Sequence, residues 1–235
     1  MTLIGLLVAD TVDEPFKNRF GGYSDMIRKM FERAGVFHYD FKSYEVYRQE
    51  YPKQIDECDA YVISGSRLSS YDKVPWIERL LDYILKLHRH RKKTVGICFG
   101  HQCMATALGG RVEKSHRGWG VGVHEYNILD SKAFPSLDGS PVQLQCSHQD
   151  QVVEMPTGAE RILESEFCPH AGMRVDNHFI SIQPHPEFCR DFAEYLLCSR
   201  EDELGSLFNS AMSSLAMETH ANEISQSLSA FIDSR

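Results

Sequence analysis

The order of apolar segments in the first 110 residues constrains the fold more than any other feature of the sequence. Short apolar runs, typical of strands, alternate there with longer segments whose apolar residues recur at helical spacing. Strands and helices in this alternation form βαβ units, in which helices cover both faces of a parallel sheet. Strands are expected at 3–9, 36–41, 60–66 and 94–98, and amphipathic helices at 23–35 and 75–91.

The pattern changes after residue 110. Between 111 and 182 the apolar segments are short, alternate with polar residues and are separated by turn residues, which indicates a largely antiparallel section. The predicted fold is therefore α/β: a three-layer, flavodoxin-like, mostly parallel sheet flanked by helices, with an antiparallel section. A polar segment of helical periodicity follows, and we expect one domain over 1–190 with a C-terminal helical extension over 191–235. The extension is expected to pack on the same domain or to pair with a second copy in a homodimer.

Charge and cysteine usage narrow the class of protein. The formal net charge is −8, which does not favour binding to nucleic acid, because phosphate backbones attract basic surfaces. No segment approaches the ~20 apolar residues that cross a bilayer, and we expect the N-terminal apolar run to be a buried strand rather than a signal peptide. The 7 cysteines form no C-x-x-C pair, which argues against a disulfide framework or structural zinc and favours a reducing, cytoplasmic location.

One cysteine lies on a tight bend. Gly96-Ile97-Cys98-Phe99-Gly100 has the form G-x-C-x-G at a predicted strand-to-helix junction, the arrangement of a nucleophile elbow. Such a turn raises the sulfur above the sheet edge, and the helix N-terminus beneath it stabilises a thiolate. The backbone N–H of Phe99 would point toward an oxyanion formed at the attacked carbon. Taken alone, the pattern is equally compatible with a cysteine buried for packing.

A base for this nucleophile is predicted near residue 185. Pro184 and Pro186 favour an extended backbone at the residues that precede them. Because residues i and i+2 of an extended chain project to the same side, His185 and Glu187 should lie side by side. The carboxylate would then fix the imidazole tautomer, which is the usual role of the third group in a catalytic triad. Cys98, His185 and Glu187 together favour a catalytic function.

The segments "GICFGHQ" (96–102) and "QPHPEF" (183–188) resemble the class I (triad) glutamine amidotransferase family. The chain is most similar to the stand-alone branch near the amidotransferase domain of GMP synthase, which also includes γ-glutamyl peptidases. The resemblance covers residues 1–190 and includes "SGSRLSSYD" (64–72), "PWIERL" (75–80), "HRGWGVG" (116–122) and "SHQDQVVEMP" (147–156). It implies that Cys98 is the nucleophile, His185 the general base and acid, and Glu187 the orienting carboxylate.

The resemblance also implies a substrate pocket. Gly65 and Phe99 would supply the two backbone N–H groups of an oxyanion hole, and Gln102 would contact the α-carboxylate or α-amino group of a glutamyl substrate. The glutamyl pocket would be completed by backbone near Ser147, His148 and Gln149. Gln149 departs from the glycine that is commoner in the family at this position.

The implied reaction is hydrolysis of the γ-glutamyl amide of glutamine through a γ-glutamyl thioester, without a metal or an organic cofactor. The substrate would be a small molecule, glutamine or another γ-glutamyl compound. No segment of the sequence resembles a synthetase. Either a separate synthetase subunit receives the ammonia, or the chain acts alone as a γ-glutamyl peptidase or hydrolase. A non-catalytic binding module is a third interpretation, and the presence of all three triad residues argues against it.

Overall fold

The computed structural model describes residues 1–14 and 16–234 of the chain. The first half contains β1 (Thr2–Val8), α1 (Phe16–Phe20), α2 (Tyr23–Arg33), β2 (Tyr39–Glu45), β3 (Ala60–Ile63), α3 (Pro75–Arg89), β4 (Thr94–Ile97) and α4 (Phe99–Ala107). The second half contains β5 (Arg111–Lys114), β6 (Gly120–Ile128), β7 (Val142–His148), β8 (Asp150–Glu154), β9 (Glu160–Glu164), β10 (Gly172–Val175) and β11 (Phe179–Ile182). The chain ends in α5 (Arg190–Cys198), α6 (Glu201–Leu204), α7 (Leu207–Ser214) and α8 (Ala221–Asp233).

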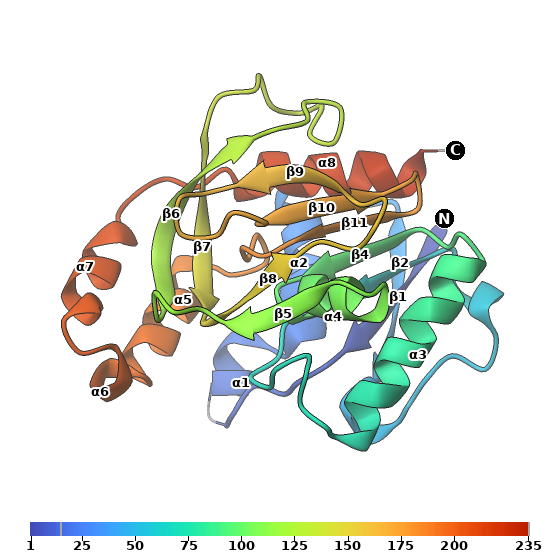
Figure 1. Cartoon of the computed structure of the whole chain (residues 1–235), viewed down its shortest axis with the longest axis horizontal. Helices are drawn as coiled ribbons and strands as arrows, with labels where there is room; N and C mark the ends of the chain where they lie inside the picture. The colour runs from blue at the N-terminus through green and yellow to red at the C-terminus, as the bar shows by residue number, and fades with distance from the viewer. Residues whose placement is uncertain (15, 235) are drawn as a thin grey trace.

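A 9-stranded sheet in the order β2-β1-β3-β4-β11-β10-β9-β6-β7 forms the centre of the molecule (Figure 1). The strands from β2 to β11 in this order are parallel, and those from β11 to β7 pair antiparallel. β5 and β8 form a separate antiparallel ribbon. The predicted α/β class, with an antiparallel section after residue 110, is confirmed. β11 belongs to both parts, because it pairs parallel to β4 and antiparallel to β10.

The two faces of the parallel strands bury different clusters, as expected for a three-layer fold. Ile4 and Leu6 of β1 pack in the cluster that includes α2 and α8, whereas Leu7 packs in the cluster that includes α3 and α4. This division follows from the period of a strand, in which successive side chains point to opposite faces. A sheet buried on both faces explains why β1 and β4 are almost entirely apolar.

The boundary between α2 and β2 differs from the prediction. Gly35 adopts φ +79°, and the amides of Gly35 and Val36 donate to the carbonyls of Glu32 and Phe31. This turn ends the helix in a left-handed conformation that glycine adopts without strain. The chain therefore joins the sheet only at Tyr39, and the expectation of a strand over 36–41 was wrong at its start.

The C-terminal helices pack on the sheet-bearing part of the molecule. α8 contacts α2, and the hydroxyl groups of Tyr39 in β2 and Ser229 in α8 are 2.8 Å apart. α5 and α7 contact β6, and Ala193 and Leu197 of α5 pack with Ala211 of α7 in a third cluster. The helices after residue 190 therefore contact the sheet-bearing part of the molecule, and Arg235 lies outside the described residues.

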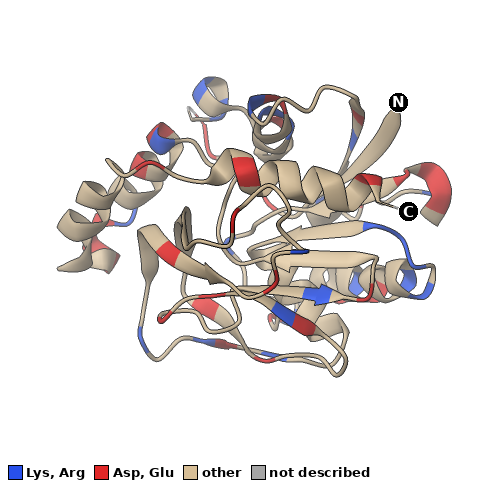
Figure 2. Ribbon diagram, turned by 90° about the horizontal axis from the view of Figure 1, so that it is seen from above, with Lys and Arg blue, Asp and Glu red and all other residues tan. Residues whose placement is uncertain are grey.

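Basic residues (Lys, Arg) and acidic residues (Asp, Glu) are interspersed along the ribbon (Figure 2). Within residues 1–14 and 16–234, no helix has the length and apolar character needed to cross a membrane.

Candidate active site

Cys98 occupies a strained turn between β4 and α4. Its backbone has φ +51° and ψ −101°, a conformation that residues with a side chain rarely adopt. A Cβ at Gly100 would lie 2.5 Å from the carbonyl oxygen of Ile63, and a Cβ at Gly96 would lie 2.8 Å from the carbonyl carbon of Gly100. The two glycines are therefore required by close approach of the backbone, as the elbow pattern predicts.

The sheet brings His185 beside this turn. Cys98 continues the pairing of β4 with β11, because its N–H donates to the carbonyl of Ile182 at 2.9 Å. Three residues after that carbonyl, His185 Nδ1 lies 2.7 Å from Glu187 Oε1, and both side chains are buried. A carboxylate only accepts hydrogen bonds, so the proton of this pair is on Nδ1 and the other ring nitrogen is left for the sulfur.

Further contacts fix this pair in place. The Phe188 ring stacks on the His185 imidazole with 3.9 Å between centroids, and the two planes differ by 8°. From α2, Arg33 Nη2 donates to the carbonyls of Pro186 and Glu187, each at 3.2 Å. The proline-bracketed segment is therefore held by packing on one side and by a guanidinium on the other.

Opposing effects act on the pKa of His185. Burial is the largest single effect and lowers this pKa, but the Glu187 carboxylate, the Cys98 thiolate and hydrogen bonds to both outweigh it. The net result is a His185 pKa well above its usual value. An imidazolium is consequently stable beside the sulfur at neutral pH, and such a cation favours the thiolate form of a cysteine.

Gly65 and Phe99 border the same point. A Cβ at Gly65 would lie 3.1 Å from His185 Cε1 and 3.9 Å from Cys98 Cβ, so the loop after β3 reaches both predicted catalytic side chains. Phe99 is the first residue of α4, where backbone N–H groups have no acceptor within the helix. Both residues are positioned next to Cys98.

A cavity of about 490 Å³ opens onto Cys98. Its lining includes every residue predicted for substrate binding, namely Gln102, Ser147, His148 and Gln149. His148 Nδ1 lies 3.0 Å from the carbonyl oxygen of Asp150, which requires the proton on Nδ1. Burial lowers the pKa of His148 to about 3, so its ring is neutral and its buried Nε2 is an acceptor without a partner among the described residues.

Three residues that the sequence did not single out complete this site. Gln183 Nε2 donates to Cys98 Sγ at 3.4 Å. Arg200, from the C-terminal extension, lines the cavity, donates to Ser147 Oγ at 2.7 Å and lies over the Trp119 ring. The sequence could have identified Gln183. It precedes Pro184 and lies two residues before His185 in an extended segment, so its side chain projects to the same side as His185. Arg200 has no comparable signal, since it lies beyond the predicted domain.

Asp150 is the third of these residues, and it joins the antiparallel part of the fold to the loop that follows β3. Its carboxylate accepts hydrogen bonds from the hydroxyl groups of Ser69 and Tyr71, and its carbonyl accepts from Gln102. These contacts connect two sides of the cavity, one formed by the residues that follow β7 and the other by the loop that follows β3.

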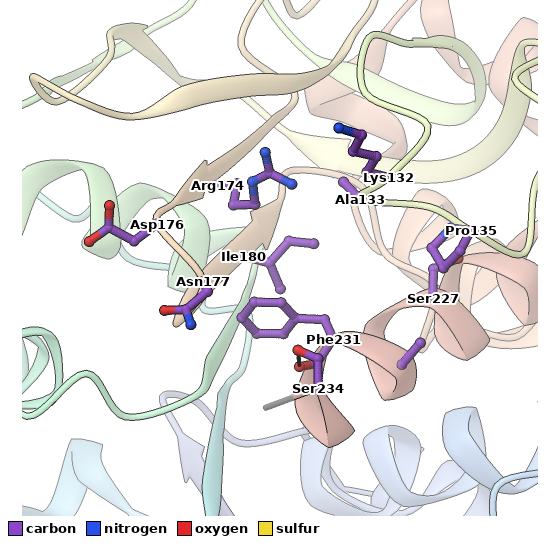
Figure 3. Close-up of a pocket in the computed structure, with 11 residues that line it drawn as sticks. Lys132, Ala133, Pro135, Arg174, Asp176, Asn177, Ile180, Ser227, Phe231 and Ser234 are labelled. Atoms are coloured by element: carbon purple, nitrogen blue, oxygen red, sulfur yellow. Dashed lines mark hydrogen bonds between the residues drawn. The ribbon is translucent and has the colours of Figure 1, made fainter.

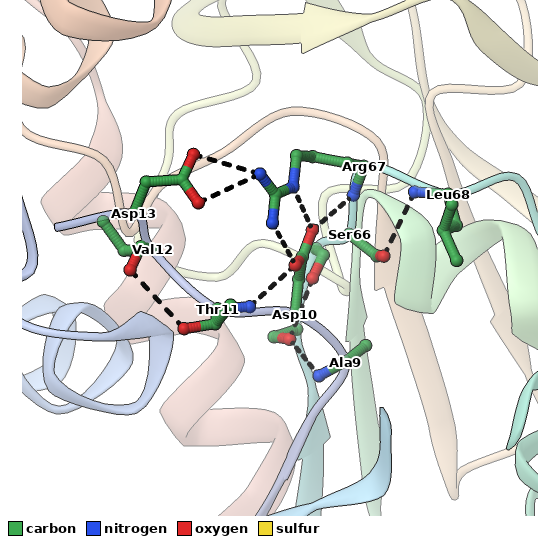
Figure 4. A network of polar contacts seen from close by, with 10 residues as sticks. Ala9, Asp10, Thr11, Val12, Asp13, Ser66, Arg67 and Leu68 are labelled. Atoms are coloured by element: carbon green, nitrogen blue, oxygen red, sulfur yellow. Dashed lines mark hydrogen bonds and ion pairs between the residues drawn. The ribbon is translucent and has the colours of Figure 1, made fainter. Parts of the chain in front are cut away.

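Arg67 lines the cavity but is already neutralised. Its guanidinium forms ion pairs with Asp10 and Asp13 from the loop after β1, with contacts of 3.1 Å to each carboxylate (Figure 4). The network connects the loops after β1 and β3 at the carboxyl ends of parallel strands, where α/β proteins bind ligands. Lys114 and Arg200, by contrast, line the cavity without an ion-pair partner among the described residues.

A second cavity, of about 310 Å³, lies where α8 faces β10 and β11 (Figure 3). Ile180 and Phe231 contribute apolar surface there, and Arg174 contributes charge. None of the predicted site residues lines it. Over the described part of the chain, no group of three or more His, Cys, Asp or Glu side chains is arranged to hold a metal ion.

The sequence and the fold are both similar to those of known proteins. The model of the class-I glutamine amidotransferase family matches residues 20–193. Gamma-glutamyl peptidase 4 of Arabidopsis thaliana is 32% identical over 194 residues, which cover 79% of this chain and 76% of the relative. One subunit of the glutamine-hydrolysing GMP synthase of Archaeoglobus fulgidus is 28% identical, over 72% of this chain and 85% of the relative. A glutamine amidotransferase crystal structure from Thermotoga maritima shares the fold, with a TM-score of 0.78, 18% identity and coverage of 98% and 99% of the two chains.

Proposed function

This chain belongs to the class-I glutamine amidotransferase family, and we propose that it hydrolyses γ-glutamyl amide bonds with Cys98, His185 and Glu187 as its catalytic triad. The observation that carries the proposal is the pairing of β4 with β11, which sets a cysteine on a strained turn beside a buried imidazole that is hydrogen-bonded to a carboxylate. Similarity to γ-glutamyl peptidases and to part of a glutamine-hydrolysing synthase supports the same bond as the target.

The chemistry proceeds in two steps. The Cys98 thiolate attacks the γ-carbonyl carbon, and the N–H groups of Gly65 and Phe99 stabilise the oxyanion. The C–N bond then breaks as the His185 imidazolium gives its proton to the leaving amine, which leaves a γ-glutamyl thioester. In the second step neutral His185 takes a proton from water, the resulting hydroxide attacks the thioester, and the sulfur departs as a thiolate. Glu187 keeps the imidazole in the required tautomer throughout.

Among γ-glutamyl compounds, we favour peptides as the substrate. The cavity of about 490 Å³ leaves room beyond a glutamyl group, and Arg200 and Lys114 line it without carboxylate partners among the described side chains. A peptide leaving group carries a carboxylate that these cations would attract. The domain boundary near residue 190 is also a proposal, and the position of Arg200 in the cavity implies that the 191–235 extension contributes to substrate binding.

Glutamate release tests the proposal. Purified protein is incubated with γ-glutamyl dipeptides and separately with glutamine, and we expect faster release from the dipeptides. Cys98→Ala should abolish release without unfolding the protein, whereas Cys103→Ala, which changes a buried thiol on the same helix, should retain it. Burial raises the pKa of the Cys103 thiol well above its usual value, so it cannot replace the nucleophile. Equal release by wild type and Cys98→Ala, or no release from any γ-glutamyl compound, would overturn the proposal.

Similarity to the GMP synthase relative favours a second candidate, in which this chain hydrolyses glutamine for a separate synthetase. Its signature would be glutamate release from glutamine that rises only when a synthetase is added, with little release from dipeptides.

A further inference from the structure

We propose that Gln183 is a positioning residue for the nucleophile: its side-chain amide donates to the Cys98 sulfur and stabilises the ionised form, while Gln102 holds that amide in the donating orientation. The inference rests on the proposed function in one respect, since it assigns Cys98 as the nucleophile. It adds a donor to the sulfur besides His185.

The orientation of the Gln183 amide follows from a chain of hydrogen bonds. Gln102 Nε2 lies 2.9 Å from the carbonyl oxygen of Asp150, and a carbonyl only accepts, so this atom of Gln102 must be the amide nitrogen. The same nitrogen lies 3.1 Å from Gln183, which must therefore present its oxygen there. The nitrogen of Gln183 is left to face Cys98 Sγ at 3.4 Å.

Both glutamine side chains are buried, with 0% of Gln183 and 3% of Gln102 exposed. Water therefore does not compete for the donor that faces the sulfur, and a hydrogen bond to a charged acceptor is stronger in such surroundings. A donor aimed at sulfur favours the thiolate over the thiol.

The two donors to the sulfur differ in whether they titrate during the reaction. His185 loses its proton to the leaving amine and is neutral when water is activated. His185 becomes cationic again when it takes a proton from water, whereas an amide does not titrate, so Gln183 donates to the sulfur throughout, including when the thiolate departs. The arrangement thus supplies a constant donor in addition to a transient one.

Apart from the His185 imidazolium, the titratable groups that face Cys98 do not favour its thiolate form. His185 and Glu187 follow β11, and Tyr23 lies at the start of α2, where burial first and the nearby carboxylates of Asp10 and Glu187 next raise its pKa. Burial also raises the pKa of the neighbouring thiols, which therefore stay neutral between pH 4 and 9; these are Cys103, Cys146 and Cys168.

The experiment measures the reactivity of Cys98 rather than turnover. Wild type and Gln183→Met, which has nearly the same shape but no donor, are treated with iodoacetamide between pH 4 and 9 in the absence of substrate. The labelled Cys98 peptide is quantified by mass spectrometry. Loss of one hydrogen bond to a charged sulfur should move the midpoint of the rate–pH curve up by about one pH unit, which lowers the labelling rate about tenfold at any pH well below the wild-type midpoint.

Two further variants make the result specific. Gln151→Met removes another buried glutamine amide, on β8, whose Nε2 has no partner in the described structure, and its curve should coincide with that of wild type. Gln183→Glu keeps the shape but places a second negative charge near the sulfur, so its midpoint should move to higher pH even if Gln183→Met does not fold.

A curve for a folded Gln183 variant that overlays wild type would overturn the positioning role. So would a shift of the same size in Gln151→Met, because the effect would then reflect general loss of buried amides. Labelling requires no substrate, so these outcomes are independent of glutamate release. Absence of glutamate release would refute the hydrolase proposal alone.

Discussion

The backbone conformation of Cys98 predicts that a side chain at this position destabilises the protein. At φ +51° and ψ −101°, a residue with a Cβ is strained by up to about 3 kcal/mol, whereas glycine is not. Cys98→Gly and Cys98→Ala both remove the sulfur, so the difference between them isolates the Cβ. Relative to the alanine variant, the glycine variant is less stable by about 0.8 kcal/mol because it lacks a buried methyl group. It is less stable by a further amount of about 0.5–1 kcal/mol because its unfolded chain has greater conformational freedom. Strain near this upper value exceeds the combined loss, and Cys98→Gly should then be more stable than Cys98→Ala by about 1 kcal/mol.

The assay is urea unfolding together with thermal unfolding of both variants. For a chain of this size, 1 kcal/mol corresponds to about 2–4 °C in Tm. The matched control is the pair Cys103→Gly and Cys103→Ala, within the regular part of α4, where glycine should be the less stable by about 2 kcal/mol because it loses both helix propensity and a buried methyl group. If Cys98→Gly proved no more stable than Cys98→Ala, with the control pair behaving as expected, the turn would not store strain and the elbow argument would be refuted.

Two further predictions concern titratable groups. Glu187→Gln removes the carboxylate that raises the pKa of His185. The alkaline limb of the rate–pH profile for glutamate release should therefore move to lower pH, and the rate should fall roughly 100-fold. A profile that overlays wild type would contradict the proposed role of Glu187. Burial lowers the pKa of His101 to about 4. Between pH 6.5 and 4 the unfolded chain therefore binds a proton that the native state does not. The free energy of unfolding consequently falls as the pH falls, by up to about 3 kcal/mol. His101→Gln should remove this part of the pH dependence in urea unfolding at pH 4.5 and 7, and an unchanged difference between the two pH values would show that His101 is not its source.

The local features of the fold could be predicted because each is encoded within a short segment. The burial of β1 on both faces follows from its continuous apolar run, and the end of α2 follows from Gly35. The side-by-side arrangement of His185 and Glu187 follows from the two prolines that hold the chain extended. The crowding at the Cys98 turn follows from the glycines on either side of it.

Features that depend on which strands become neighbours could not be predicted in the same way. The spacing of apolar residues in the sequence does not predict which strands pair. It therefore does not show that β11, at the end of an antiparallel section, pairs with β4. It also does not place Arg200 over Trp119, or Asp150 against the loop that carries Ser69, because these contacts join segments distant in sequence. Gln183 differs from these, since the rule that located His185 and Glu187 applies to it equally.

The pairing of β4 with β11 separates the roles of two parts of the chain. The spacing between sulfur and imidazole is set by backbone hydrogen bonds between adjacent strands, and it does not depend on the residues that connect them. The long connection, 99–178, carries Gln102, Ser147 and Asp150 and forms much of the cavity wall. Insertions or exchanges in the part of that connection beyond α4, 111–178, would therefore alter which molecule is admitted while leaving bond cleavage intact, and a family built on this frame can diversify its substrates without rebuilding its reaction.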